Sequence, residues 1–133
     1  MDFAWSETQA SLYETALTFA RERLHRITAH GAVDPGIPDP PVSSAGRPRF
    51  PRDAWARCGE FGLLGLSVPA TWGGMGLDAL TTAHVLEAFG LGCEDTGLLF
   101  GVAAHLFACV MPIAEHATPA FKSRVFPELC IGR

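Results

Sequence analysis

One segment limits what this chain can fold into more than any other. Residues 97–114 read GLLFGVAAHLFACVMPIA, eighteen residues in which only His105 can carry a charge near neutral pH. A helix that is apolar on every side belongs in a protein core or in a membrane, and this length is just enough to span a bilayer. Pro112, the central His105 and acidic flanks without a basic anchor argue against a span. We therefore expect a buried central helix and no association with a membrane.

Capping signals predict helices on both sides of this segment. The expected starts are, in chain order, a capping box at Ser6–Gln9, Pro51, Asp78, Asp95 or Thr96, and Thr118 with Pro119. Gly62 should end the second helix, and Pro127 should bend or end the last. Because no alternating strand pattern is present, we expect an all-α fold, an up-and-down bundle of about five helices.

The length of 133 residues fits a single domain over residues 1–133, with a Pro- and Gly-rich linker at 31–49 inside it. Apolar residues make up 48% of the chain, which argues against disorder. Charged residues make up 18%, below the roughly 25% of an ordinary domain, so we expect a partner to cover part of the surface. The net charge of −4, without a basic stripe, argues against nucleic-acid binding.

Apolar spacing predicts which sides of the helices face inward. Residues 63–68 should enter the core, and the three glycines of the turn at 69–76 should need positive φ or close backbone approach. For the helix that follows Asp78, the expected inward residues are Leu80, Ala83, Leu86 and Phe89.

The residues themselves predict no catalytic or metal site. His84 and Glu87 share a helix face, and we expect a solvated pair there rather than metal ligands. For His105 we favour a core histidine bonded to a backbone carbonyl, and we expect Cys109 to be inert in apolar surroundings. The glycines at 74 and 76 lack the third glycine and the preceding strand of a dinucleotide fingerprint. The absence of an N-terminal leader and of any CxxC pair favours a reduced, cytoplasmic chain.

The stretch FPRDAWARCGEFGLLGLSVPATWGGMGLDALTTAHVLEAFG at 50–90 resembles the amino-terminal helical domain of the acyl-CoA dehydrogenase family. The shared pattern is FP, an amphipathic helix, GLLG, VP, an aromatic-GG-x-GLD turn and a helix that reads like LVLEE. The later MPI and FKSRVFPEL also look like the family. The resemblance covers nearly the whole chain, and the linker is its least similar part.

The resemblance implies a function that is divided between parts. Family members combine this helical domain with a middle β-domain and a carboxyl-terminal bundle, which hold FAD and the glutamate base. The base removes the α-proton of an acyl thioester and the flavin takes the β-hydride. Because residue 133 lies about where the β-domain would begin, we expect no catalytic, FAD-binding or metal-binding residue in this chain. The resemblance therefore assigns the base to none of Glu60, Glu87, Glu94, Glu115 and Glu128.

The resemblance also implies one wall of the acyl pocket. In the family, the helix equivalent to 96–114 lines the distal end of this pocket. Counting back from the matching MPI places Leu99, Phe100, Ala103, Ala104 and Ala108 at or beside the lining positions. Helical spacing agrees, because 100, 104 and 108 share one stripe. The sequence leaves open whether this stripe lines a pocket or packs within the bundle.

We accordingly expect the helical subunit of an FAD-dependent oxidoreductase that acts on the CH–CH bond of an acyl-CoA or acyl-carrier-protein substrate. FAD would be bound mainly by a partner chain that carries the β-domain and the carboxyl-terminal bundle, in an obligate hetero-oligomer formed through the 97–114 helix and the turn at 72–76. The alternatives are a non-catalytic binding or scaffold module and a fragment of a full-length enzyme.

Overall fold

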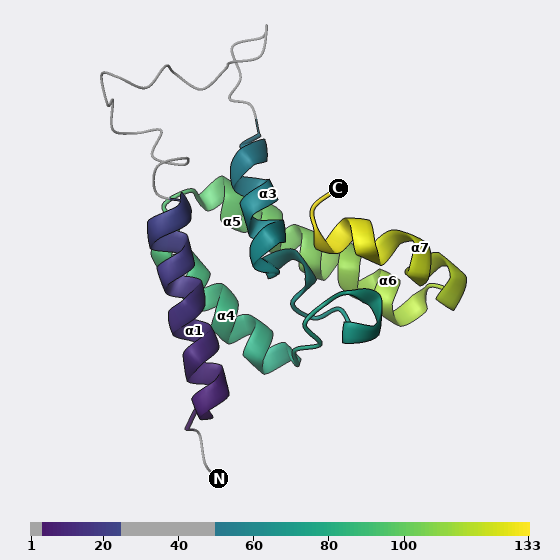
Figure 1. The fold of residues 1–133 in the computed structure, drawn as a ribbon, viewed down its shortest axis with the longest axis horizontal. Helices are drawn as coiled ribbons and strands as arrows, with labels where there is room; N and C mark the ends of the chain where they lie inside the picture. The colour runs from purple at the N-terminus through teal and green to yellow at the C-terminus, as the bar shows by residue number, and fades with distance from the viewer. Residues whose placement is uncertain (1–3, 25–49) are drawn as a thin grey trace, which may run out of the picture.

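The computed structural model describes residues 4–24 and 50–133, and the regular structure in these ranges is helical throughout (Figure 1). The elements are α1 (Glu7–Phe19), η1 (Ala20–Leu24), α3 (Arg52–Phe61), η2 (Leu63–Gly65), η3 (Ala70–Trp72), α4 (Ala79–Gly92), α5 (Thr96–Ala104), η4 (His105–Val110), α6 (Met111–His116) and α7 (Pro119–Cys130). Because α5, η4 and α6 form one continuous helix over Thr96–His116, these ranges hold five helices. The expected all-α fold is confirmed. The predicted linker at 31–49 lies outside the described residues.

The helix starts are fixed by the side chains that the sequence indicated. Ser6 and Gln9 form the reciprocal capping box of α1. Asp78 Oδ1 accepts from the Thr81 amide at 2.7 Å at the start of α4. The remaining side-chain caps are Asp95 on Leu98 N at 2.9 Å and Thr118 on Phe121 N at 3.3 Å. These bonds satisfy amides that have no partner within their own helix.

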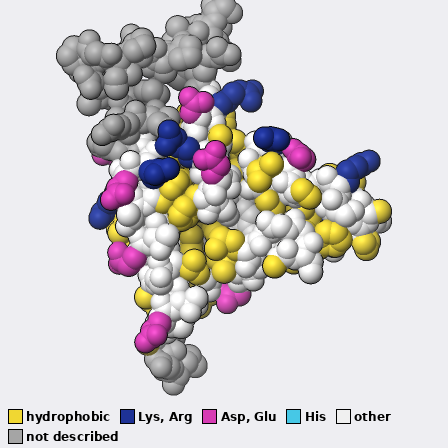
Figure 2. Space-filling view, viewed as in Figure 1, with side chains coloured by type: hydrophobic (Ala, Val, Ile, Leu, Met, Phe, Trp, Pro, Cys, Tyr) yellow, Lys and Arg dark blue, Asp and Glu magenta, His cyan; other side chains and the backbone are white. Residues whose placement is uncertain are grey.

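Large apolar side chains also remain on the surface of the described chain. They are Trp5, Phe50, Met75, Leu80, Leu91, Phe100, Phe107, Phe121 and Ile131. Figure 2 shows apolar side chains over the middle of one face and on over α6 and α7, while many of the charged groups lie towards its edges. Contiguous apolar surface of this kind is typical of an interaction site.

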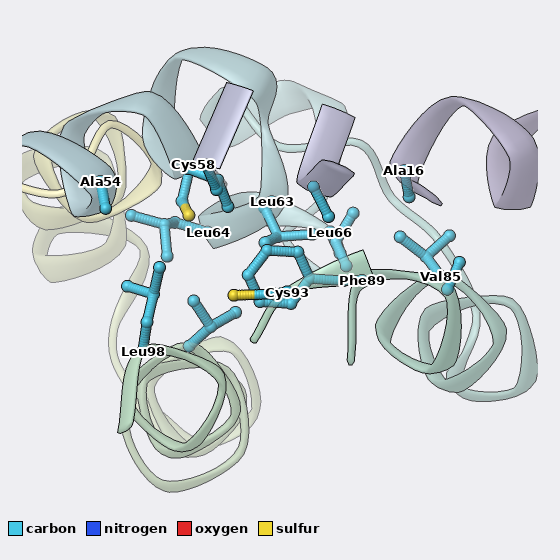
Figure 3. Packing of buried hydrophobic residues seen from close by; sticks show 14 of the residues in the cluster. Ala16, Ala54, Cys58, Leu63, Leu64, Leu66, Val85, Phe89, Cys93 and Leu98 are labelled. Atoms are coloured by element: carbon cyan, nitrogen blue, oxygen red, sulfur yellow. The ribbon is translucent and has the colours of Figure 1, made fainter. Parts of the chain in front are cut away.

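Two buried clusters hold the helices together. The larger combines residues of α1, α3, α4 and α5 around the segment after α3, and Figure 3 shows Leu63, Leu64 and Leu66 of that segment pointing inward with Phe89 of α4. The smaller cluster contains Val68, Val110, Phe126 and Cys130. It packs α7 against the end of the long helix, so both clusters depend on the segment at 63–68, as the sequence predicted.

The turn after Pro69 folds back on that segment. The amides of Met75, Gly76 and Leu77 donate to the carbonyls of Gly65, Val68 and Leu66 at 3.0, 2.8 and 2.8 Å. Gly73 and Gly76 have φ of 91° and 65°, and a Cβ on Gly74 would overlap the backbone of Val68. Positive φ and close approach therefore account for all three glycines, as expected.

The buried side of α4 differs from the predicted side. Leu80 is 65% exposed and Ala83 is also exposed, Leu86 is half-buried, and only Phe89 of the predicted set is buried. The buried residues are Thr81, Thr82, His84, Val85, Ala88 and Phe89. The orientation follows from α1, which packs along α4 and whose Gln9 Nε2 donates to Thr81 Oγ1 at 2.9 Å. Because both sides of α4 carry apolar residues, the sequence of α4 alone does not decide which side is buried. The contact with α1 decides it.

The expectation of a solvated pair at His84 and Glu87 is also wrong. His84 is not solvated: its ring stacks on Trp5 with centroids 3.7 Å apart and lies 4.5 Å from Tyr13, which leaves it 8% exposed. Glu87 lies 3.5 Å from its Nδ1 and remains in solvent. At Pro127, where the sequence predicted a bend or an end, the helix does not end, because α7 continues to Cys130.

The close approach at Gly74 gives a stability prediction. Gly74→Ala should destabilise the chain by about 3 kcal/mol, because the new methyl group overlaps packed backbone. Gly101→Ala is the matched control, since its Cβ would lie 3.6 Å from the nearest side-chain atom, and it should stabilise by up to about 1 kcal/mol in a helix interior. Urea denaturation measures both. Equal midpoints for the two variants would contradict the packing of the turn.

Candidate functional site

The candidate site lies on the long helix formed by α5, η4 and α6. Its core side consists of Leu98, Val102, Leu106 and Val110, all completely buried. In an α-helix of 3.6 residues per turn, a stripe with a spacing of four drifts around the axis. The i→i+5 bonds of the π-helical segment η4 widen the turn and offset this drift. The stripe therefore stays on the core along the helix.

The opposite side of this helix is uncovered. Phe100 is 75% exposed and Phe107 is 47% exposed, and only 22% of the helix's most apolar window is buried. Within the described ranges this is the one helix whose length and composition would suffice to cross a membrane. The expected burial of this helix therefore holds for one of its sides, and the other side is left open to a partner, as the sequence also indicated.

The structure brings four of the five predicted pocket residues to this uncovered side. Phe100 and Ala108 are exposed, and Ala103 and Ala104 are half-buried. We call these four residues, together with Phe107, the open face. Burial within the bundle is excluded for Phe100 and Ala108 in the described chain. Leu99 differs, because it packs on the core cluster.

Aromatic side chains from α3 and the residues before it border the open face. The Phe50 and Trp55 rings meet edge to face with centroids 5.4 Å apart, and Trp55 meets His105 in the same way at 5.4 Å. A Cβ at Gly101 would contact Phe50 and Trp55 at 3.6 and 3.7 Å. Sequence reasoning missed these aromatics and Phe107. The position of Phe107, seven residues after Phe100 and so two helical turns away, was an available signal.

His105 has the structural role that the sequence favoured. Its Nε2 lies 3.1 Å from the carbonyl oxygen of Leu64, to which it donates. Burial lowers the pKa of His105 because the charged ring loses its hydration, and hydrogen bonds to the Leu64 and Leu129 carbonyls oppose this effect. A neutral ring therefore ties the long helix to the segment after α3.

The cysteines differ from the expectation in one respect. Cys109 is exposed, whereas Cys58, Cys93 and Cys130 are buried. Burial raises the pKa of Cys58 to about 12 and also raises the pKa of Cys93. The prediction of an inert thiol at Cys109 is thus wrong, because Cys109 is accessible. Apolar surroundings protect the three core cysteines instead.

The open face can bind but cannot transfer a proton, because none of its five side chains is ionisable. Within the described ranges no group of three His, Cys, Asp or Glu side chains is placed to hold a metal ion. The glycine turn does not fit a phosphate, because the amides of residues 73–76 all donate to nearby carbonyls. The arrangement suits an apolar ligand wall rather than a catalytic centre or a dinucleotide cradle.

Comparison with known proteins shows which proteins this chain is similar to. Residues 6–133 match the family described as "Acyl-CoA dehydrogenase, N-terminal domain". The chain is 58% identical over 83 residues to an L-prolyl-[peptidyl-carrier protein] dehydrogenase of Pseudomonas fluorescens, covering 62% of this chain and 22% of that protein. It is 31% identical over its whole length to the protein of the same description from a Serratia species, of which it covers 31%.

The chain is also similar in fold to a solved structure. The chain superimposes on the structure described as "PigA with FAD and proline" with a TM-score of 0.79 and 32% sequence identity, over 99% of this chain and 31% of that one. The chain therefore spans less than a third of the length of each of these relatives.

The lowered pKa of His105 predicts a pH-dependent stability. The unfolded ring, with a pKa near 6.5, binds a proton more readily than the folded ring, so acid favours unfolding. The free energy of unfolding should therefore decrease as the pH falls from 7 through about 6.5 towards the lower folded pKa. His105→Gln keeps a donor for Leu64 and should weaken this dependence, whereas His116→Gln, at an exposed site, should not. If the free energy of unfolding depends on pH in the same way in the wild type and in His105→Gln, this prediction is contradicted.

Proposed function

Because the chain belongs to the acyl-CoA dehydrogenase family, whose amino-terminal domain it matches, we propose that it supplies the helical lobe of an FAD-dependent acyl-thioester dehydrogenase. The observation that carries this proposal is the open face, an uncovered apolar side on a helix whose other side is fixed in the core. Such a surface gains stability when it is removed from water. A pocket wall needs this combination of exposure and rigidity.

The proposed role of the chain's residues is to bind and to exclude water. Phe100, Ala103, Ala104 and Ala108 would form one wall of the acyl pocket, and Leu99, which packs on the core cluster, would support this wall. Phe100 projects from the amino-terminal part of the wall, and the small alanines that follow leave room for the acyl group. FAD, when bound by the remaining parts, would accept the hydride, and the general base would also come from those parts. The wall would hold the acyl group and keep water from it.

We propose an aminoacyl thioester on a carrier protein as the substrate, rather than an acyl-CoA. The support is the similarity to two proteins described as L-prolyl-[peptidyl-carrier protein] dehydrogenases and to a structure described as containing FAD and proline. A pyrrolidine ring is compact and mostly apolar, which suits a wall of alanines with one phenylalanine.

We further propose that a partner chain carries the β-domain, the carboxyl-terminal bundle and most of the FAD contacts. The chain spans 22% and 31% of the two L-prolyl-[peptidyl-carrier protein] dehydrogenases, and large exposed apolar side chains also lie outside the open face, as at Leu80 and Leu91 of α4. The long helix and the turn at 72–76 would contact the partner. An interface above about 1,000 Å² is expected for such a specific association.

Complementation tests the proposed assembly. The Pseudomonas relative, truncated to remove the part that matches this chain, would be coexpressed with the 133-residue chain and purified through a tag on the latter. We expect a yellow complex that oxidises the L-prolyl thioester of a carrier protein, and a colourless, inactive chain on its own. A complex without activity would favour the scaffold alternative, and no complex at all would contradict the split assembly.

A matched pair of variants tests whether the long helix is the contact. Phe107→Asp places a charge on the open face and should abolish copurification, because an unpaired charge in an apolar interface is strongly unfavourable. Phe121→Asp changes an exposed phenylalanine of α7 and should leave the complex intact. The reverse result would move the interface from the long helix to α7.

Phe100→Ala in the assembled enzyme tests the pocket wall. The variant should accept bulkier acyl groups, because the phenyl ring narrows the wall. The lone chain should lose no more than about 1 kcal/mol of stability, since the ring is 75% exposed and the cost of about 3–5 kcal/mol applies to a fully packed ring. The ratio of kcat/KM for the prolyl and the bulkier thioesters is the readout. An unchanged ratio in a folded variant would remove Phe100 from the pocket.

A further inference from the structure

A pocket of about 240 Å³ lies between the start of α4, the segment at 67–77 and the end of the long helix. Its apolar lining includes Leu77, Phe107, Met111 and Ala114. It adjoins the open face through Phe107. The volume is sufficient for a compact ring of five or six atoms, and most of the surface that such a ring would meet is hydrocarbon.

Two hydroxyl groups at this pocket have no hydrogen-bond partner. Ser67 and Thr82 both line it, and Ser67 Oγ and Thr82 Oγ1 are buried and unpartnered. Thr82 is only 1% exposed. As placed, both oxygens lie below the surface of the pocket, so each must change its χ1 rotamer before it can bond an occupant. Because an unpaired buried hydroxyl is costly and uncommon, the two groups indicate an occupant that supplies a hydrogen bond.

The charge at the pocket restricts the occupant. Among the described residues that line the pocket, Glu115 is the only charged one, and its side chain is 64% exposed. A carboxylate or phosphate in the pocket would be repelled by this group and would gain no opposite charge. The apolar lining in turn disfavours a strongly hydrated ligand. An uncharged molecule with a compact hydrocarbon body and one hydrogen-bonding oxygen meets both conditions.

We propose that this pocket is a binding site for a small neutral alcohol or amide, held by the Thr82 and Ser67 hydroxyls and enclosed by Leu77, Met111 and Ala114. The site is built from this chain alone, so the proposal does not depend on the proposed dehydrogenase function.

Cyclopentanol is a suitable probe, titrated into the isotope-labelled 133-residue chain with backbone amide shifts as the readout. Saturable shifts are expected at Thr82 and Ala114, with a millimolar Kd for so small a molecule. Cyclopentanecarboxylate keeps the ring but carries a charge, and it should bind at least tenfold more weakly. Thr82→Val removes one hydroxyl and should weaken cyclopentanol binding about five- to tenfold. The same variant should raise the Tm of the free chain, because an unpaired buried hydroxyl is lost.

A second pair of variants separates the pocket from the rest of α4. Ala79→Phe fills the pocket from its exposed rim, so the chain should fold and lose the cyclopentanol shifts. Ala83→Phe, at an exposed position one turn later and outside the lining, should retain them. No saturable shift in the wild type, or equal shifts in the wild type, Thr82→Val and Ala79→Phe, would overturn the proposal and leave the pocket to water.

Discussion

The structure depends on the buried stripe of the long helix, formed by Leu98, Val102, Leu106 and Val110. The first three belong to the larger cluster and Val110 to the smaller one, so this stripe joins the two parts of the core. Each such side chain contributes about 1.5–3 kcal/mol on burial. Together they match the net stability of an ordinary domain, about 5–15 kcal/mol. The bond from His105 to Leu64 adds a directional contact that fixes the rotation of the helix.

This rotation decides which side of the helix remains in solvent. Once the stripe is on the core, Phe100, Phe107 and Ala108 must point away from it. The same packing that stabilises the domain therefore presents an apolar surface that the other described residues leave uncovered. In the proposed function this surface would be one wall of the acyl pocket. The fold and the proposed function thus depend on two sides of one helix.

Local signals predicted where the main helices start, because a cap involves residues only a few positions apart, as at Asp78 and Thr118. The buried side of α4 could not be predicted in this way. Leu80 and Val85 are both apolar, and the contact with α1, distant in sequence, selects Val85 for the core. The π-helical segment η4 and the exposure of Cys109 follow from tertiary packing as well. The pocket positions came from the family resemblance, since a purely apolar face carries no chemical motif.

The rate at which Cys109 reacts with a maleimide measures whether a partner covers the exposed surface of the long helix. Cys109 is the exposed thiol of the long helix, and the other three cysteines are buried. The account predicts one fast-reacting thiol in the lone chain at low concentration, and strong protection of that thiol in the complex with the truncated relative. An equal rate in both states, or protection already in the lone chain, would show that the exposed surface of the long helix at Cys109, next to Ala108 of the open face, is not covered by a partner.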